Sequence, residues 1–434
     1  MSKFIAKPAA TLTGNLKVPG DKSISHRCIM LGSLANGTTE VSGFLQGADA
    51  LATLSAFKQM GVKIERSGDK VRIHGVGLHG LKKPDAALNL GNSGTSMRLM
   101  AGILAAQDFD SELTGDASLS KRPMDRIITP LTQMGALIES NNGKPPLKIK
   151  GAQKLKGIEY HLPIASAQIK SCVLLAALYA QGKTCIIEPQ TTRDHTERML
   201  NGLGYELDMA ANKICLSGGG KLKSAQFQVP SDISSAAFFM VAGCIAKHAD
   251  ITLEGVNINP TRTGVIDILQ LMGANLTLSN KQEIGGELLA DIRVKSSVLH
   301  GITIPTELVP LAIDEFPAIF IAASCAQGET HLNGAKELRV KESDRIQVMA
   351  DGLDILGIKN QVLADGIKIQ GGKFGKPSGI IQSAHDHRIS MSFAIASLRC
   401  DYPLEIEGVE NVATSFPDFV KLANTIGMNI AQIN

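Results

Sequence analysis

Six segments of this chain repeat one plan, in which a polar cluster precedes an apolar helix rich in small residues, a short turn and an alternating strand. Successive segments begin 70, 74, 66, 83 and 72 residues apart, near Asp21, Gly91, Ala165, Ser231, Asp314 and Asp386. Internal repetition of this kind constrains the architecture more strongly than any local propensity. The chain is therefore expected to be an α/β protein built from six small modules.

The helix of each segment is apolar around its whole circumference, and a helix of that kind has to be buried on every side. These helices are expected over residues 28–35, 97–106, 172–180, 236–246, 318–326 and 389–398. Alternating or β-branched strands follow, as at 39–41, 184–187 and 251–253. Amphipathic segments such as 50–60 and 264–272 supply outer helices. The fold is predicted to carry its main helices inside and its sheets outside.

Two copies of one short pattern divide the chain. Val18-Pro19-Gly20-Asp21-Lys22-Ser23 recurs 211 residues later as Val229-Pro230-Ser231-Asp232-Ile233-Ser234, and three segments follow each copy. A chain of 434 residues is also too long for one ordinary core. We therefore expect two domains, 18–230 and 1–17 with 231–434, and an active site in the cleft between them.

The polar clusters at the helix starts are rich in cations and hydroxyls. If three parallel helices form each core, their N-termini point the same way and favour anions. The first cluster holds Lys22, Ser23 and Arg27, and the glycines of Gly91-Asn92-Ser93-Gly94-Thr95 let backbone amides approach a ligand. Taken singly, each cluster is also explained by a capped helix start with solvated charges. Their repetition favours a small polyanionic ligand instead.

Composition argues against several other kinds of protein. The net charge of +3 and the lack of tryptophan disfavour nucleic-acid and membrane binding. Seven scattered cysteines without a Cys-x-x-Cys pair indicate buried apolar residues in a reducing compartment, with neither disulfides nor a zinc site. The first ten residues show no signal-peptide pattern, and the longest apolar run, 236–246, is too short to span a membrane. We expect a cytoplasmic globular protein.

Carboxylates are conspicuous among these cations, because anion binding alone disfavours them. Asp314, Glu315 and Glu342 could serve proton transfer, one accepting a hydroxyl proton and another delivering a proton. Each is also explained as a helix cap or an ion pair, and His387 is either an acid–base group or a capped helix start. No cluster has metal-ligand spacing and no Ser-His-Asp arrangement stands out, so no metal, cofactor or covalent catalysis is expected.

Five motifs together resemble the 3-phosphoshikimate 1-carboxyvinyltransferase family, the EPSP synthases, and they extend over essentially the whole chain. These motifs are Asp21-Lys22-Ser23-Ile24-Ser25-His26-Arg27, Gly91-Asn92-Ser93-Gly94-Thr95, Lys121-Arg122-Pro123-Met124, Arg339-Val340-Lys341-Glu342-Ser343-Asp344-Arg345 and Asp386-His387-Arg388. Ser166-Ala167-Gln168, 193–197 and 413–417 are similar to the class II branch of the family. The resemblance implies a two-domain, inside-out α/β fold, in which each domain has three βαβαββ units with buried parallel helices.

The resemblance also implies a reaction and its residues. The enolpyruvyl group of phosphoenolpyruvate moves to the 5-hydroxyl of shikimate 3-phosphate through a tetrahedral ketal, phosphate is released, and the product leads to chorismate and the aromatic amino acids. The implied shikimate 3-phosphate contacts are Lys22, Ser23, Arg27, Ser166, Gln168, Arg193, Asp314 and Lys341. The implied phosphoenolpyruvate contacts are Lys22, Gly94, Arg122, Gln168, Arg345 and Arg388. Asp314 matches the base, Glu342 the proton donor, and Lys22 a second proton-transfer group.

The sequence departs from the family at two positions. Thr414 stands where many relatives have lysine, and Glu337 where some have an asparagine that touches the shikimate phosphate. Gly94 leaves room beside the phosphoenolpyruvate position, so the resemblance implies space for the inhibitor glyphosate. The expected partners are the two small substrates alone, without nucleic acid or membrane, and a monomer is expected.

Two other functions stay open on the sequence alone. An enolpyruvyl transferase acting on UDP-N-acetylglucosamine shares the fold and the phosphoenolpyruvate chemistry, although the Asp-Lys-Ser and Lys-Glu-Ser-Asp-Arg motifs fit shikimate 3-phosphate better. A non-catalytic anion-binding protein could use the same cations, but it has no use for Asp314 and Glu342. The individual protons are not assigned among Lys22, Glu342 and His387.

Overall fold

The computed structural model describes residues 2–433. They form two compact units. The first unit contains Gly20–Val229 together with the short segment Ile284–Glu287. The second unit contains the described residues up to Pro19, then Pro230–Glu283 and the described residues from Leu288 onward. The first unit therefore includes the tip of a hairpin from the second half of the sequence, which the repeat pattern does not indicate.

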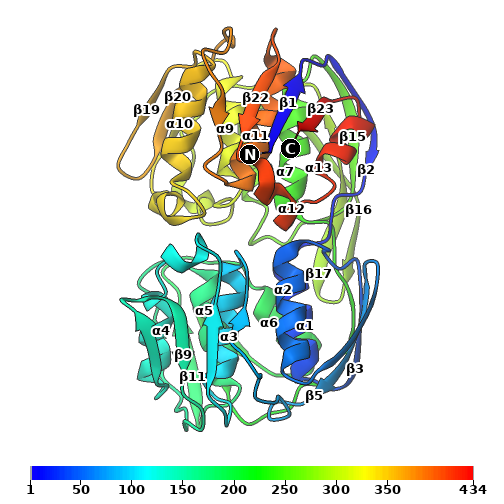
Figure 1. Cartoon of the computed structure of the whole chain (residues 1–434). Coiled ribbons are helices and arrows are strands. Elements are labelled where there is room, and N and C mark those ends of the chain that lie inside the picture. Colours follow the sequence, from blue (N-terminus) through cyan, green and yellow to red (C-terminus); the bar gives the residue numbers. More distant parts are fainter. Residues whose placement is uncertain (1, 434) are drawn as a thin grey trace. The chain divides into compact units, whose positions relative to one another are not determined.

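Three central helices run through each unit, and they are the repeat helices expected from the sequence (Figure 1). Those of the first unit are α1 (Lys22–Leu34), α3 (Gly94–Leu104) and α5 (Ala167–Ala177). Those of the second unit are α7 (Ile233–Ile245), α9 (Phe316–Ser324) and α11 (His387–Ala396). The prediction of six repeat helices is confirmed, and each helix begins two to six residues before its expected apolar run.

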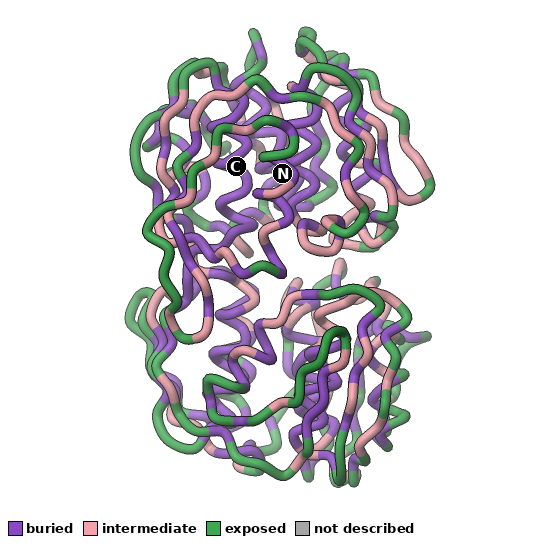
Figure 2. Tube along the Cα trace, turned by 180° about the vertical axis from the view of Figure 1, so that it is seen from behind, coloured by how far each residue is buried: buried purple, intermediate pink, exposed green. Residues whose placement is uncertain are grey.

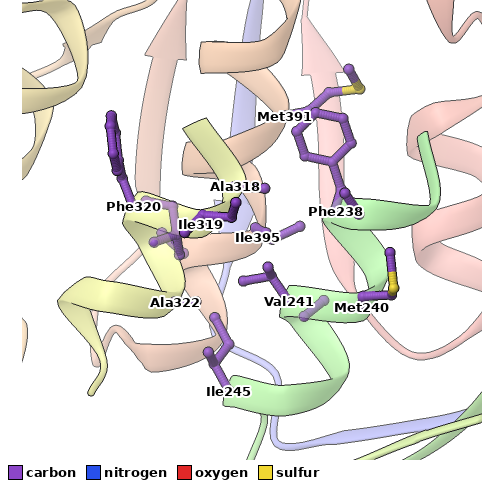
Figure 3. Packing of buried hydrophobic residues seen from close by; sticks show 14 of the residues in the cluster. Phe238, Met240, Val241, Ile245, Ala318, Ile319, Phe320, Ala322, Met391 and Ile395 are labelled. Atoms are coloured by element: carbon purple, nitrogen blue, oxygen red, sulfur yellow. The ribbon is translucent and has the colours of Figure 1, made fainter. Parts of the chain in front are cut away.

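These helices are buried on all sides, as their composition requires. Every residue of α7, α9 and α11 is buried, and the burial colours of Figure 2 follow the same helices. Side chains of Val241, Ile319 and Ile395 meet between the three helices of the second unit (Figure 3). In the first unit Gly102 of α3 lies so close to α5 that an added Cβ would stand 2.2 Å from the Cys172 carbonyl oxygen. Small residues therefore set the distance between central helices.

Six sheets surround the helices, three in each unit. The first sheet of the first unit has the strand order β14 (Gln226–Gln228), β3 (Asn36–Ser42), β5 (Lys70–Val76), β4 (Lys63–Ser67). The second has the order β6 (Leu88–Asn89), β7 (Ser111–Thr114), β9 (Lys144–Ile149), β8 (Ile138–Asn141). The third has the order β10 (Glu159–His161), β11 (Lys183–Ile187), β13 (Lys213–Ser217), β12 (Asp208–Ala210). In each, a parallel pair at one edge continues into two antiparallel pairs. One strand plan thus repeats three times.

The second unit follows the same plan with one shortened copy. Its first sheet has the strand order β21 (Ile381–Gln382), β22 (Leu404–Glu407), β1 (Lys3–Lys7), β23 (Asn429–Ile433). The second has the order β16 (Asn275–Ile284), β17 (Glu287–Lys295), β15 (His248–Asn257), β2 (Thr11–Leu16). The third has only three strands, in the order β18 (Glu329–Leu332), β20 (Ile367–Gln370), β19 (Asn360–Val362). In the three-stranded sheet two isolated parallel bridges, His300 to Gln327 and Thr303 to His331, occupy the place of the edge pair. The strands expected at 39–41, 184–187 and 251–253 lie within β3, β11 and β15.

Outer helices complete each module. They are α2 (Ala48–Gln59), α4 (Asp125–Gln133) and α6 (His195–Gly202) in the first unit, and α8 (Gly264–Leu271), α10 (Arg345–Ile355) and α13 (Phe419–Thr425) in the second. The amphipathic helices predicted at 50–60 and 264–272 correspond to α2 and α8. The inside-out α/β class, with helices inside and sheets outside, is confirmed.

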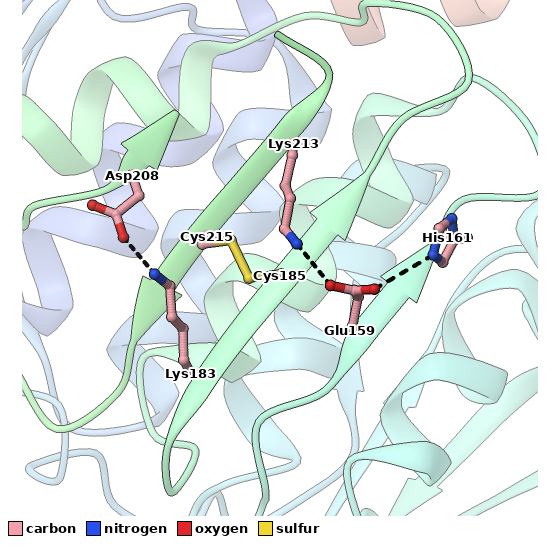
Figure 4. Close-up of a disulfide and its surroundings, with 7 residues drawn as sticks. All are labelled: Glu159, His161, Lys183, Cys185, Asp208, Lys213 and Cys215. Carbon is pink, nitrogen blue, oxygen red and sulfur yellow. Dashed lines mark hydrogen bonds and ion pairs between the residues drawn. A yellow bond between two sulfur atoms is a disulfide. The ribbon is translucent and has the colours of Figure 1, made fainter. Parts of the chain in front are cut away.

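One expectation about the cysteines is wrong. Cys185 and Cys215 form a disulfide, and they are directly opposite residues of the antiparallel pair β11–β13 (Figure 4). The Cys185 amide donates to Ile158 on the other side of the strand, so the two cysteines occupy a non-hydrogen-bonded pair, where side chains lie closest. Spacing alone gave no sign of this, because strand register brings together residues 30 apart in sequence. The five remaining cysteines are free.

No helix in the described part of the chain is long and apolar enough to cross a membrane. Residues 2–433 also contain no group of three or more His, Cys, Asp or Glu placed to hold a metal ion.

Candidate active site

The start of α1 places Lys22 at the head of the first unit's site. Asp21 caps the helix, accepting a 2.9 Å hydrogen bond from the Ile24 amide. The Lys22 ammonium lies 3.0 Å from the Asp49 carboxylate in the first turn of α2, and both side chains are largely buried. Asp49 was not among the predicted site residues. Its place after Gly47, at the start of an outer helix, gave no sequence signal of contact with Lys22.

Arg27 lies one turn further along α1 and is buried by polar partners. Its Nε donates to Thr196 Oγ1 and its Nη2 to Ser171 Oγ, both at 2.7 Å, while Nη1 donates to the Ser23 carbonyl at 2.9 Å. Burial lowers the pKa of Arg27 to about 10, with Glu197 and Asp21 opposing that shift. Arg193, partly buried ahead of α6, adds a repulsive positive charge. The structure therefore brings these two predicted cations within electrostatic range of each other.

The start of α3 carries the glycine loop. Ser93 caps the helix, and Gly94 follows it in a buried position. A Cβ at Gly94 would stand 2.9 Å from Arg98 Nη1 and 3.2 Å from Arg122 Nη1, so glycine leaves space for two guanidinium groups beside the helix start. Arg122 is itself oriented by a 2.5 Å hydrogen bond to the Asn92 side chain.

Gln168 joins the starts of α3 and α5. Its carbonyl oxygen accepts from Arg98 Nη1 at 2.8 Å, and its amide nitrogen donates to Thr95 Oγ1 at 3.0 Å. Ser166 caps α5 through the Ile169 amide. These bonds put the first turns of two central helices side by side, which shows that the helices run parallel.

Lys170 lies in the first turn of α5, next to Gln168 and Ile169 in sequence, and its side chain is buried. Its ammonium is buried 2.7 Å from Glu197 and 3.0 Å from Glu188. Burial alone lowers the pKa of Lys170, but these two carboxylates raise it above its ordinary value. Burial also raises the pKa of Glu197. Lys170 is therefore part of an internal ion cluster beneath Arg27.

A chain of neutral hydrogen bonds lies beneath the first unit's helix starts. His26 Nδ1 is 2.8 Å from Thr53 Oγ1, which is 2.6 Å from Ser96 Oγ, and Ser96 Oγ donates to Ser93 Oγ at 2.6 Å. All four residues are buried. Burial, with Lys22 and Arg27 nearby, lowers the pKa of His26 to about 3, so the ring stays neutral at ordinary pH. His26 therefore orients its neighbours across α1, α2 and α3.

The second unit's site is organised around Arg345, at the first residue of α10. This guanidinium is 1% exposed, and its three nitrogens contact three carboxylates: Asp386 at 2.9 Å, Asp314 at 3.2 Å and Glu342 at 2.6 Å. Burial alone lowers the pKa of Arg345, but the three carboxylates together hold it above its ordinary value. Residues from two of the motifs thus meet Asp314 at one side chain.

Asp314 lies immediately before α9 and contacts a second cation. Its Oδ1 is 3.2 Å from the Lys341 ammonium as well as from Arg345. The Asp314 backbone carbonyl accepts a 2.9 Å hydrogen bond from Arg388 Nη1 in the first turn of α11. Asp386 caps that helix through the Arg388 amide. The start of α11 is therefore tied directly to the residues that precede α9.

Glu315 differs from its neighbour. It is buried and accepts a hydrogen bond from Ser234 Oγ in the first turn of α7. Arg262, from the loop before α8, lies 3.7 Å from the same carboxylate. Glu315 is thus an internal ion-pair partner rather than a second proton-transfer group, and Arg262 is a residue that the sequence interpretation missed. The side chain of Thr414 donates to the Asn411 carbonyl within its own short helix.

The two sets of residues offer different chemistry. In the first unit, cations and hydroxyls meet helix N-termini, an arrangement that binds phosphate and carboxylate groups. In the second unit, carboxylates share cations, an arrangement that can exchange protons with a bound molecule. Neither set resembles a nucleophile activated by a neighbouring base.

Comparison with known proteins agrees with this chemistry. The family model of EPSP synthase (3-phosphoshikimate 1-carboxyvinyltransferase) matches residues 6–422. Proteins named 3-phosphoshikimate 1-carboxyvinyltransferase from Vesicomyosocius okutanii and Ruthia magnifica are 72% and 73% identical to the chain, over its full length and theirs. A solved EPSP synthase from Acinetobacter baumannii is 59% identical, with a TM-score of 0.88 over the full length of both chains.

A more distant solved structure shows that the fold extends beyond this similarity. The enolpyruvyl transferase NikO from Streptomyces tendae superimposes with a TM-score of 0.80 at 14% identity, over 100% of this chain and 99% of that one. The fold is therefore that of the enolpyruvyl transferases. Within it, the chain belongs to the EPSP synthase family, whose members are 3-phosphoshikimate 1-carboxyvinyltransferases.

Proposed function

We propose that the residues gathered at these helix starts catalyse carboxyvinyl transfer from phosphoenolpyruvate to shikimate 3-phosphate. The reaction joins the enolpyruvyl group to the 5-hydroxyl of shikimate 3-phosphate and releases inorganic phosphate, by addition and then elimination through a tetrahedral ketal. The observation that carries the proposal is the contact of Arg345 with both Asp314 and Glu342. One cation thereby places a base and an acid at the same site.

The substrates are held by the cations and hydroxyls. Shikimate 3-phosphate is assigned to Lys22, Ser23, Arg27, Ser166, Gln168, Arg193, Asp314 and Lys341. Phosphoenolpyruvate is assigned to Lys22, Gly94, Arg122, Gln168, Arg345 and Arg388. Each set includes residues of both units. The hydrogen bonds that already fix Arg27, Gln168 and Arg122 support this assignment, because preoriented donors lose little freedom on binding.

Proton transfer is assigned to the second unit. Asp314 takes the proton of the 5-hydroxyl while Glu342 protonates the methylene carbon of phosphoenolpyruvate, which gives an oxocarbenium-like centre for the hydroxyl to attack. Two cations contact Asp314, and such an environment suits a carboxylate that must start as a base. Because Asp314 and Glu342 share Arg345, a proton gained by one alters the charge balance at the other. Lys22 assists departure of the phosphate.

General acid–base catalysis of this kind contributes about 10²–10⁴-fold to the rate. The larger share is assigned to holding two anions in contact among fixed cations, away from water.

The test is release of phosphate from phosphoenolpyruvate with each acceptor in turn. We expect release with shikimate 3-phosphate, and none with UDP-N-acetylglucosamine or without an acceptor. Release only with the nucleotide sugar would assign the chain to the other acceptor. Binding of phosphoenolpyruvate without release to either acceptor would indicate a non-catalytic anion-binding protein.

Glyphosate, which resembles phosphoenolpyruvate, is expected to bind at Gly94. The close approach of Arg98 and Arg122 to this glycine supports the assignment, because any larger residue there would press on both guanidinium groups. Inhibition should be competitive with phosphoenolpyruvate, and no inhibition at high glyphosate with low phosphoenolpyruvate would contradict it.

A monomer in the cytoplasm is also proposed. All of the assigned substrate contacts come from one chain, so no second copy is needed to complete them. Sedimentation at micromolar concentration should give the mass of one chain. The activity per enzyme molecule should not depend on the enzyme concentration.

A further inference from the structure

A buried ion network lies beneath the second unit's site, and the proposed reaction makes no use of it. It consists of Asp232, Ser234, Arg262 and Glu315, which are 8%, 3%, 2% and 1% exposed. Arg262 Nη2 donates to Ser234 Oγ at 2.8 Å and to Asp232 at 3.3 Å, and it lies 3.7 Å from Glu315. The hydroxyl of Ser234 in turn donates to Glu315. Its members come from α7, the loop before α8 and the start of α9.

This network reaches a substrate residue through Glu315. Arg388 Nη1 lies 4.0 Å from the same Glu315 oxygen that faces Arg262, and it donates to the Asp314 carbonyl at 2.9 Å. Two arginines therefore flank one buried carboxylate. Arg262 is enclosed on the interior side, whereas Arg388 is the one assigned to phosphoenolpyruvate.

A buried carboxylate requires a compensating charge, and the nearest arginine supplies it. With Arg262 present, Glu315 is neutralised from within the core, and Arg388 keeps a longer contact to it. Without Arg262, Arg388 would become the only arginine near Glu315 in the described structure. It would then be drawn onto the carboxylate and away from an anionic substrate.

We propose that Arg262 is a positioning residue for phosphoenolpyruvate binding: by neutralising Glu315, it leaves the Arg388 guanidinium for the anionic substrate. This inference rests on the assignment of Arg388 to phosphoenolpyruvate. It also explains why an acidic residue is tolerated beside Asp314 in a site for anions.

The experiment measures KM for both substrates in five variants, of which Glu315→Gln alone is one. Arg262→Met should raise KM for phosphoenolpyruvate about tenfold, the order of one charged hydrogen bond, and leave KM for shikimate 3-phosphate within twofold. Adding Glu315→Gln to Arg262→Met should return KM for phosphoenolpyruvate to within about threefold of wild type, because the competing charge is gone. Arg262→Lys, which keeps the charge, should have a KM for phosphoenolpyruvate close to that of the wild-type protein.

Arg293→Met is the matched control, because Arg293 belongs to the same unit and pairs with Asp250 on the surface, at 2.6 Å. It should leave both KM values unchanged. A purely structural role for Arg262 predicts additive losses of stability, and no recovery of KM in the double variant.

An unchanged phosphoenolpyruvate KM in Arg262→Met, or a double variant worse than either single change, would overturn the inference. If Arg262→Met does not fold, Arg262→Lys and Glu315→Gln decide the question. Both should then keep phosphoenolpyruvate KM within about threefold, and a tenfold rise in either contradicts the proposal. The wild-type rate in the same assay reports the proposed reaction separately.

Discussion

The helix starts of the two units are built on one plan but carry different chemistry. In the first unit the layer beneath the starts of α1 and α3 is neutral, a buried hydrogen-bond chain of His26, Thr53, Ser96 and Ser93, and an ion cluster lies only beneath Arg27. In the second unit the supporting layer is ionic, with carboxylates gathered on Arg345. A neutral hydrogen-bond chain adds no negative charge of its own beside the cations, which suits anion binding, whereas shared carboxylates suit proton transfer.

The paired sequences Val18–Ser23 and Val229–Ser234 show this difference at one position. Asp21 and Asp232 both cap a central helix. The residue that follows is Lys22 in the first unit, where it faces Asp49, and Ile233 in the second, where it is buried in the core. The shared part builds the helix start, and the variable part supplies the function.

The largest effect is expected from the proton-transfer group of the second unit. Glu342→Gln keeps a hydrogen-bonding side chain beside Arg345 but cannot carry the proton, so kcat should fall about 10²–10⁴-fold. Steady-state phosphate release measures this. Glu405→Gln, which removes an exposed carboxylate paired with Lys3 in the same unit, should leave kcat unchanged. A Glu342→Gln enzyme with full turnover would remove this residue from the mechanism.

Lys22→Ile makes the first unit copy the second at the paired position. The fold should survive, because isoleucine occupies the corresponding place in α7, while turnover should fall about 10²–10³-fold for loss of a charge on the departing phosphate. Circular dichroism and phosphate release on the same sample test both parts. Full activity in Lys22→Ile would show that the added lysine is not what distinguishes the two units.

A packing change should loosen the first unit alone. Gly102→Ala forces a Cβ toward the Cys172 carbonyl, so α3 and α5 must separate, and the free energy of unfolding should fall by about 1–3 kcal/mol. The hydrogen bonds of Gln168 with Arg98 and Thr95 join the same two helices. Because Gln168 is assigned to both substrates, KM for both should rise as well. Urea unfolding measures stability. Gly202→Ala, where nothing lies within 4 Å, is the control and should not destabilise the protein.

The neutral layer also predicts a pH dependence of stability. The pKa of His26 is about 3 in the folded protein and about 6.5 when unfolded, so between about pH 3 and 6.5 mainly the unfolded state binds this proton. Stability therefore falls as the pH drops, by about 1.4 kcal/mol between pH 7.5 and 5.5 from this residue. Urea unfolding at these two pH values should show a smaller loss of stability in His26→Gln than in the wild-type protein. A loss of stability in His26→Gln equal to that of wild type would contradict the assignment. His161→Gln, which changes an exposed histidine, is the control.

Much of the fold follows from the sequence because its cause is local. All-round apolar helices can only be buried, and a cap such as Asp21 or Asp344 fixes where a helix begins. Strand register is not local. The pairing of Cys185 with Cys215, and the return of Ile284–Glu287 to the first unit, depend on which strands meet, so neither could be inferred from spacing.

The candidate site divides in the same way. The cations at helix starts are visible as repeated motifs, so Lys22, Arg27 and Arg345 could be named in advance. Their partners could not, since Asp49 and Arg262 lie in segments without a motif and reach the site only through tertiary packing. The burial of Lys170 between two carboxylates likewise depends on tertiary packing rather than on a motif.

The most direct test of this division of labour is the affinity of shikimate 3-phosphate for Arg27→Met and Asp314→Asn, measured by titration calorimetry beside turnover. We predict that Arg27→Met loses binding by tenfold or more, as expected for a charged hydrogen bond, while Asp314→Asn binds within about tenfold of wild type with kcat reduced about 10²–10⁴-fold. Unchanged binding in Arg27→Met, or loss of binding in Asp314→Asn that accounts for its lost turnover, would contradict it.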